Sequence, residues 1–187
     1  MFADQLLRHF LHMPVEEEGR LVNKALRENF VTRVFAYHRW QSTVESNLDT
    51  ATIQTFHRRH KFLLMAHGPE GARLLGATLG RAVRHASLNR LAAEYLSGFS
   101  SVMSRTPTRK GHTNVLQHLA GYVSNGIDAA DRRELTNVID EYRRELLPLI
   151  VPVSLIRHYV RKLELPYLVD QVYLNPHPHE LMLLNHV

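Results

Sequence analysis

The fold is decided by one stretch, Ile53–His67, which reads IQTFHRRHKFLLMAH. A basic run, HRRHK, passes directly into an apolar run, FLLM. At the period of an α-helix one face would carry five side chains, spaced by three and four: Ile53, Phe56, His60, Leu63 and His67. Arg58, Lys61 and Gln54 then point elsewhere. The pattern predicts a helix, capped by Asp49 or Thr50 and ended by Gly68-Pro69, that packs with one side and offers positive charge with another.

Length and composition exclude several classes of protein. The 187 residues suffice for one large domain with its own core, which at this size buries about 70% of the surface of the unfolded chain. The chain has no cysteine, so it holds no disulfide, no thiolate-bound iron–sulfur cluster and no cysteine zinc site of its own. It contains no apolar run of membrane-spanning length, and charges interrupt its first ten residues. We expect a soluble, cytoplasmic protein with no membrane partner.

Positive charge is concentrated in the middle third. Residues 51–110 hold 10 Lys or Arg against 2 Asp or Glu, a net charge of +8. Residues 1–50 are at −1 and residues 111–187 at −2, which gives the total of +5. A localised basic segment attracts polyanions and steers their approach, whereas the plainer interpretation is a solvated helical surface.

The remainder of the chain also has helical periodicity, and no stretch alternates with the period of a strand. We therefore predict an all-α fold, a single bundle-like domain of about seven helices around one core. A helix from Asn23 to about Gln41 is predicted to have an inward stripe of Leu26, Phe30, Val34 and either Tyr37 or His38, with Trp40 near its end. Residues 70–84 form a helix with Leu74, Leu75, Thr78 and Leu79 inward, and the helix after Ser87 buries Leu88, Leu91, Ala92, Tyr95, Phe99 and Met103. A loop over 105–112 precedes a helix at 113–125, and the next helix runs from Asp128 through Leu146. A kinked connection between Pro148 and Pro152 leads to helices at 153–163 and 167–174.

Four runs in order carry a family resemblance: HRRHKFLLMAHG (57–68), NVLQHLAGYV (114–123), PLIVPVSLIRHYV (148–160) and QVYLNPHPHELML (171–183). Together they resemble the YbgA-like domain family over about residues 50–185. The runs PVEEEGRL (14–21) and RENFVTRVFAYHRW (27–40) resemble the junction in longer proteins where this domain follows a TudS-type thiouracil desulfidase domain. Residues 1–22 are therefore interpreted as a remnant helix and junction, and residues 23–187 as the YbgA-like helical domain.

The resemblance implies a function. In the fused enzymes, called RudS, the first domain holds the iron–sulfur cluster and removes sulfur, and the YbgA-like part is implied to help hold thiouridine-containing tRNA. This chain lacks the cysteine-bearing domain, as an excised domain or a stand-alone version would. We expect a tRNA-binding accessory domain with no catalysis and no cofactor of its own, whose partners are tRNA and a TudS-type desulfidase domain, in cis or in trans.

The RNA interpretation assigns roles to particular side chains. Arginine and lysine would meet phosphates, and an exposed tyrosine would stack on an unpaired base. Two residues near a helix N-terminus, His112 and Asn114, would add hydrogen bonds to a phosphate. The predicted RNA-binding residues are Arg58, Arg59, Lys61, Arg105, Arg109, Lys110, His112, Asn114, His118 and Tyr122. Trp40 could also stack if exposed, but core packing is the better interpretation.

Two alternatives remain open. Thirteen histidines are available for a metal hydrolase, and the pairs His57/His60 and His112/His118 have spacings that could converge, but no H-E-x-x-H or comparable signature occurs. His60 and His67 have apolar neighbours and are expected in the core. Alternatively, an apolar patch around Leu7, Phe10 and Leu11 would make the chain a protein-interaction or homodimerisation module.

Overall fold

The structure is a computed structural model that describes residues 12–82 and 87–178. Its elements are the 3-10 turns η1 (Glu18–Val22) and η2 (Ser124–Gly126) and the helices α2 (Lys24–Ser46), α3 (Thr50–His67), α4 (Pro69–Ala82), α5 (Leu88–Met103), α6 (Arg109–Val123), α7 (Ala129–Arg143), α8 (Ile150–Lys162) and α9 (Pro166–Val169). These ranges contain no strand, so the all-α prediction is confirmed. No helix within them combines the length and apolarity needed to cross a bilayer. The predicted helix at 1–12 and the apolar patch in it lie outside the described residues.

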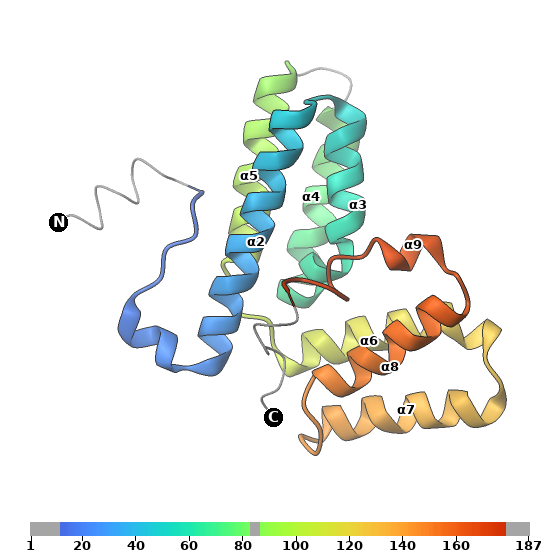
Figure 1. The fold of residues 1–187 in the computed structure, drawn as a ribbon. Helices are drawn as coiled ribbons and strands as arrows, with labels where there is room; N and C mark the ends of the chain where they lie inside the picture. The colour runs from blue at the N-terminus through green and yellow to red at the C-terminus, as the bar shows by residue number, and fades with distance from the viewer. Residues whose placement is uncertain (1–11, 83–86, 179–187) are drawn as a thin grey trace.

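The helices form two layers, which Figure 1 shows. Helices α2, α3, α4 and α5 run up and down beside one another, and α6, α7 and α8 lie across their lower end. α3 contacts α4 and α5 in the first layer and α6 in the second. The quoted stretch is therefore the element that joins the two layers.

The prediction for α3 is confirmed. Asp49 caps the helix, with a side-chain oxygen that accepts a hydrogen bond from the Thr52 backbone N–H at 2.7 Å. All five residues of the predicted face are buried. Phe62 and Ala66, on another side of the helix, are buried as well. The basic side chains Arg58, Arg59 and Lys61 are exposed.

An aromatic cluster fills the core of the first layer. The Phe56 ring lies 5.1 Å from that of Trp40, 5.2 Å from that of Phe99 and 3.9 Å from the imidazole of His60. Trp40 also stacks on Tyr95, with ring centroids 5.3 Å apart. Trp40 is 4% exposed, as its core interpretation predicted.

The predicted inward stripe of α2 is wrong. Val34 is 39% exposed, and Leu26 and Phe30 are only partly buried. The buried positions are Asn29, Thr32, Ala36 and Trp40. Trp40 is anchored in the aromatic cluster, so the inner face of α2 consists of the residues that precede it at helical spacing. These are Ala36, four positions before Trp40, Thr32, four before Ala36, and Asn29, three before Thr32. Small and polar side chains therefore form the inner face, and the helix extends to Ser46.

The inward set on α4 is half correct. Leu75 and Leu79 are buried, whereas Leu74 is 52% exposed and Thr78 is exposed. The inner face is completed by Ala72, and the glycine-rich sequence lets α4 approach α5 closely. A Cβ on Gly71 would lie 2.8 Å from a Val102 methyl carbon.

On α5, Leu91, Ala92, Tyr95, Phe99 and Met103 are buried as predicted, and Leu88 is partly buried.

Four element boundaries in the second half of the chain differ from the predictions. α6 begins at Arg109, within the predicted loop, because the Thr108 hydroxyl caps it by accepting a hydrogen bond from the Gly111 N–H at 3.1 Å. α8 begins at Ile150, since a proline such as Pro152 fits the first turn of a helix, where its missing N–H has no helical partner. Leu146 lies beyond the end of α7 and is 60% exposed. α9 is shorter than the predicted 167–174.

Gly111 lies where α6 crosses α3. A Cβ placed on it would come within 2.5 Å of the Ala66 carbonyl oxygen, which is backbone and cannot rotate away. We predict that Gly111→Ala lowers the free energy of unfolding by about 1–3 kcal/mol, as overpacking does. Gly121→Ala, on the same helix with nothing within 4 Å of the added Cβ, is the control and should raise stability by up to about 1 kcal/mol. Urea denaturation of both variants checks the prediction, which equal effects would contradict.

Residues 171–177, which we call the C-terminal strap, bind α2 and α3. The Gln171 amide donates to the Arg58 carbonyl at 3.0 Å, and the Val172 N–H donates to the Arg59 carbonyl at 2.9 Å. The Arg39 guanidinium donates to the Pro176 carbonyl at 2.8 Å. The strap therefore ties α2 and α3 to each other.

Candidate functional site: a basic aromatic seam and a buried cavity

The strongest surface candidate lies where α3 meets α6 and α9. The Tyr122 side chain, on α6, is 46% exposed, and its ring lies 6.1 Å from that of Phe62 and 5.7 Å from that of Tyr167. Lys61 places its ammonium 5.7 Å from the centre of the Phe62 ring. Arg58, on α3, carries its charge beside Tyr167, and His118 lies about one helical turn before Tyr122 on α6. We call the set the α3–α6 seam: Arg58, Lys61, His118, Tyr122 and Tyr167.

Helical spacing explains why these side chains meet. Arg58 and Lys61 are three residues apart on α3 and share one side of it, as His118 and Tyr122, four apart, do on α6. Arg58, Lys61 and His118 are all exposed. The nearest acid is Asp170, whose carboxylate is 3.9 Å from the Arg58 guanidinium with both side chains about half exposed. Such a pair neutralises little of the field in water.

Arg105 lies at the C-terminal end of α3, beside α5. A Cβ on Gly68 would lie 3.5 Å from the Arg105 guanidinium and 3.9 Å from a methyl carbon of Val102 on α5. Lys110 and Asn114 lie on α6, and the Lys110 side chain is exposed. Of the predicted set, the seam therefore gathers Arg58, Lys61, His118 and Tyr122.

Arg109 and His112 are engaged inside the fold and leave the predicted set. The Arg109 guanidinium donates to the Tyr142 carbonyl at 2.6 Å, lies 4.6 Å from the Tyr142 ring centre and is 3.5 Å from a Glu145 oxygen. His112 is the fourth residue of α6, and its Nδ1 is 3.0 Å from the Tyr173 hydroxyl. Neither side chain is presented to a ligand on the seam.

Arg59 is separated from Arg58 although the two are adjacent in sequence. Consecutive side chains on a helix diverge by about 100°. The strap covers the α3 backbone at both residues, and Arg59 borders a different groove, between α2 and α3. Arg59, which was predicted to bind RNA together with Arg58, therefore does not lie on the seam.

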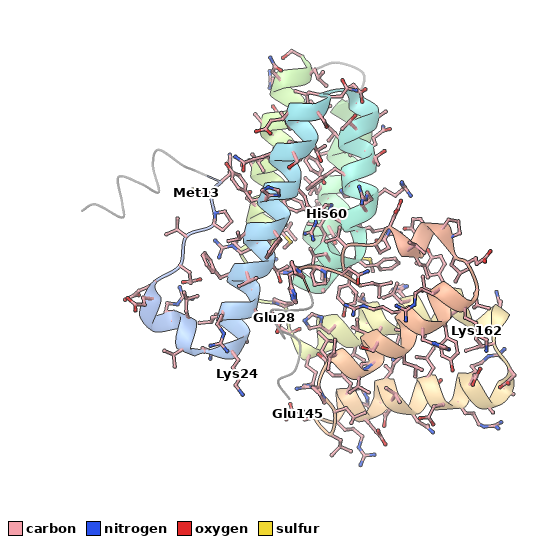
Figure 2. The ribbon with its side chains drawn as sticks, in the orientation of Figure 1. Met13, Lys24, Glu28, His60, Glu145 and Lys162 are labelled. Atoms are coloured by element: carbon pink, nitrogen blue, oxygen red, sulfur yellow. The ribbon has the colours of Figure 1, made fainter. Side chains whose placement is uncertain are left out.

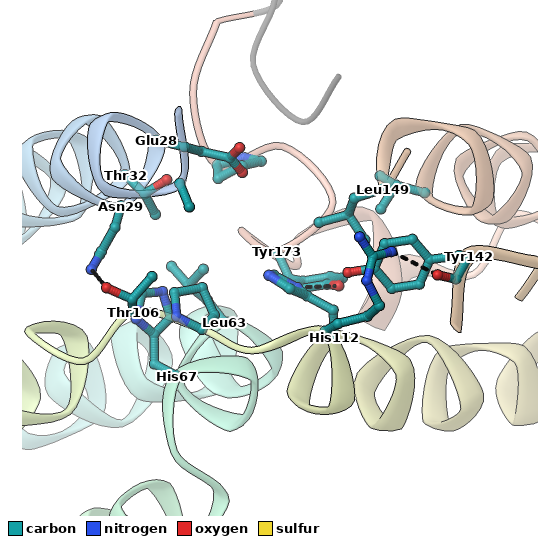
Figure 3. A pocket seen from close by; sticks show the side chains of 15 residues that line it. Glu28, Asn29, Thr32, Leu63, His67, Thr106, His112, Tyr142, Leu149 and Tyr173 are labelled. Carbon is teal, nitrogen blue, oxygen red and sulfur yellow. Dashed lines mark hydrogen bonds between the residues drawn. The ribbon is translucent and has the colours of Figure 1, made fainter. Parts of the chain in front are cut away.

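A cavity of about 200 Å³ lies between the two layers. Figure 3 shows its polar wall, in which Glu28 and Asn29 come from α2, His67 from α3, His112 from α6 and Tyr173 from the strap. Apolar side chains such as Leu63, Leu149 and Val153 complete the lining.

Burial keeps three titratable side chains of the cavity, His67, Tyr142 and Tyr173, neutral at pH 7. Burial lowers the pKa of His67 to about 4, although its Nδ1–H donates to the Arg105 carbonyl at 2.7 Å. Burial raises the pKa of Tyr142 to about 12 and that of Tyr173 well above its usual value. Both phenols therefore remain protonated and can serve only as hydrogen-bonding groups at neutral pH. The cavity can hold a small polar molecule.

Sequence reasoning missed most of the residues of this cavity. His67 was assigned to the core, which is correct, but its neighbours Glu28, Asn29, Tyr142 and Tyr173 come from segments that only the tertiary fold brings together. The local signal that could have pointed to the cavity was the pair of polar residues Asn29 and Thr32 on the buried face of α2.

The histidine pairs considered for a metal acquire no third ligand among the described residues. His60 and His67 are buried with their Nδ1 atoms bonded to backbone carbonyls, and His57 contacts the Tyr95 hydroxyl at 3.2 Å. Across residues 12–82 and 87–178, no group of three or more His, Cys, Asp or Glu is placed to hold a metal ion.

Fold and surface define an all-helical domain with a basic, aromatic seam and a cavity between its two layers. Comparison with known proteins identifies the family. The chain belongs to the family described as protein of unknown function (DUF1722), whose sequence model matches residues 61–178. The uncharacterized protein YbgA of Escherichia coli (strain K12) is 30% identical over 133 residues, which cover 71% of this chain and 79% of that protein. The YbgA-like resemblance is thereby confirmed. No solved structure matches the chain.

Proposed function

We propose that this domain binds RNA through the α3–α6 seam, as an accessory domain for an enzyme that acts on RNA. The observation that carries the proposal is the exposed Tyr122 ring beside Arg58 and Lys61, on two helices that pack together. Cations meet phosphates and an exposed ring accepts a stacked base, which is the usual combination for unpaired RNA. The net charge of +8 in residues 51–110 supplies long-range attraction.

The specific partner in this proposal is a TudS-type desulfidase domain, with tRNA as the RNA. That part rests on the sequence resemblance of residues 14–40 and of the YbgA-like motifs, since the chain itself has no cysteine to hold a cluster. The domain would add affinity for tRNA to an enzyme whose chemistry lies elsewhere.

The double variant Arg58→Glu/Lys61→Glu tests the seam. Each phosphate contact carries a salt dependence of about 0.9 in log K against log salt. For each phosphate contact that is lost, we expect the variant to bind tRNA roughly tenfold more weakly near 0.1 M salt. The slope of log K against log salt should also become shallower by about 1 per lost contact. A fluorescence-anisotropy titration at several salt concentrations measures both quantities.

The matched control is Arg133→Glu/Lys162→Glu, which makes the same charge change at exposed positions on α7 and α8. If the control weakens tRNA binding as much as the seam variant does, the attraction is unspecific and the seam is not the interface. Tyr122→Ala should weaken binding to single-stranded RNA without changing the salt slope.

A protein-interaction module is the second candidate. Apolar side chains are exposed on the described surface, among them Val22 at 81%, Leu146 at 60% and Val169 at 54%. Solution mass with and without residues 1–22 separates this candidate from RNA binding. A metal hydrolase has no matching ligand cluster in the described residues, and elemental analysis of the purified protein decides that alternative.

A further inference from the structure

A groove between α2 and α3 gathers two arginines, Arg39 and Arg59. It encloses about 570 Å³ and is lined by Arg39, Arg59 and His60 together with hydroxyl side chains such as Ser42 and Thr55. Figure 2 labels His60 between these two helices. Within the described part of the chain, neither arginine forms an ion pair with a carboxylate.

The Arg39 guanidinium is only half used. Its Nη2 donates to the strap carbonyls of Pro176 at 2.8 Å and Asn175 at 3.4 Å. Its Nη1 is buried and has no hydrogen-bond partner. A buried cationic donor without a partner is costly, so a native structure normally supplies one. Burial, followed by the positive charge of Arg59, lowers the pKa of Arg39, because a nearby cation disfavours the charged form of the guanidinium.

His60 contributes an acceptor to the same groove. Its Nδ1 donates to the Phe56 carbonyl at 2.8 Å, so Nε2 carries a lone pair in the neutral ring. That Nε2 is buried and also has no partner. The groove therefore offers a cationic donor and a neutral acceptor, and both are unsatisfied.

We propose that the α2–α3 groove binds a phosphate group, with its oxygens on Arg39 and Arg59 and a hydroxyl on or beside the phosphate donating to His60. Guanidinium groups match the several oxygens of a phosphate. A carboxylate or a sulfate satisfies the arginines but brings no proton for His60. The phosphate is either inorganic or terminal, which carries its own hydroxyl, or it belongs to an RNA backbone, where a ribose hydroxyl lies beside it.

This site is independent of the seam, because Arg58 and Lys61 take no part in its lining. Failure of RNA binding at the seam would leave the groove untouched, and the reverse also holds.

Titration calorimetry of the full chain with inorganic phosphate, at constant ionic strength, tests the proposal. We expect saturable binding to one site, which Arg59→Gln and Arg39→Gln each weaken by about 10-fold or more, the usual loss for a hydrogen bond to a charged group. The Arg59 side chain is exposed and its variant should fold even if Arg39→Gln, which loses strap bonds, does not. Arg58→Gln is the matched control and should bind phosphate as the wild type does.

A titration with sulfate tests the role of His60. Competition between RNA and inorganic phosphate tests where the phosphate comes from. Sulfate should bind the wild type more weakly than phosphate, and His60→Phe should reduce that preference. A short RNA without a terminal phosphate that competes with inorganic phosphate indicates the backbone as the source, whereas competition only by the 5′-phosphorylated RNA indicates a terminal or free phosphate. No phosphate binding by the wild type, or binding that Arg59→Gln leaves unchanged, overturns the proposal, and equal affinity for sulfate overturns the role of His60.

Discussion

The free energy of unfolding is expected to fall steeply as the pH is lowered from about 7 to about 4, because His60 and His67 fold as neutral imidazoles. Burial is the main reason that the pKa is about 3 for His60 and about 4 for His67. The charges of Arg39, Arg59 and His57 depress the pKa of His60 further, and Arg33 acts in the same direction on His67.

The direction follows from proton linkage. In the unfolded chain both histidines have a pKa near 6.5, so between that value and the folded pKa the unfolded state binds more protons. The contribution of the two neutral histidines to the free energy of unfolding is fully present above about pH 6.5. It is lost as the pH falls from there toward the folded-state pKa values of about 3 for His60 and about 4 for His67. Each histidine contributes about 1.4 kcal/mol per pH unit there, or about 3 kcal/mol by pH 4. Together they amount to a large share of the stability of a typical domain.

Urea denaturation at half-unit pH steps measures this slope. His60→Phe and His67→Gln each remove one titrating group and should each make the slope shallower by about half. His158→Gln, at an exposed position on α8, is the control and should leave it unchanged. A wild-type stability that is level between pH 7 and pH 4 would contradict the burial of both rings.

Phe56→Ala should lower the free energy of unfolding by about 3–5 kcal/mol, the usual loss for a fully buried phenylalanine. Phe56 is 4% exposed and touches Trp40, His60, Tyr95 and Phe99, so the cavity would be bordered by large rings that cannot all move in. For a chain of this length the melting temperature should fall by roughly 6–20 °C.

Leu74→Ala is the matched control for this prediction. The side chain is large and apolar like that of Phe56, but it is 52% exposed on α4, so its removal should change stability by less than about 1 kcal/mol. If the two variants melt at the same temperature, the aromatic cluster does not carry the core of the first layer.

The sequence predicted best where one period dominates. α3 was predicted with its cap, its inner face and its exposed cations, since the apolar spacing and Asp49 are local signals. α2 was predicted with the wrong face because its inner residues, Asn29, Thr32 and Ala36, have little hydrophobic contrast with their neighbours. The start of α6 was missed because Pro107 and Gly111 are typical of a loop, whereas Gly111 is there to fit against Ala66.

The candidate site was predictable only in part. Tyr122, Arg58 and Lys61 were found from charge and spacing. Arg109 is withdrawn from the predicted set because it donates a hydrogen bond to the Tyr142 carbonyl, 33 residues away, and no local pattern indicates that contact. Arg39 was missed for the same reason, since its partners in the strap lie 136 and 137 residues further along the chain.

The strap has a consequence for how the protein is made. A nascent chain leaves the ribosome from its N-terminus, and α2 and α3 emerge more than a hundred residues before the segment that ties them together. Until residues 171–177 are synthesised, the Arg58 and Arg59 carbonyls lack the strap's donors, and Arg39 lacks the carbonyls of Asn175 and Pro176. Translation must therefore pass residue 177 before the hydrogen bonds that tie α2 to α3 through the strap can form.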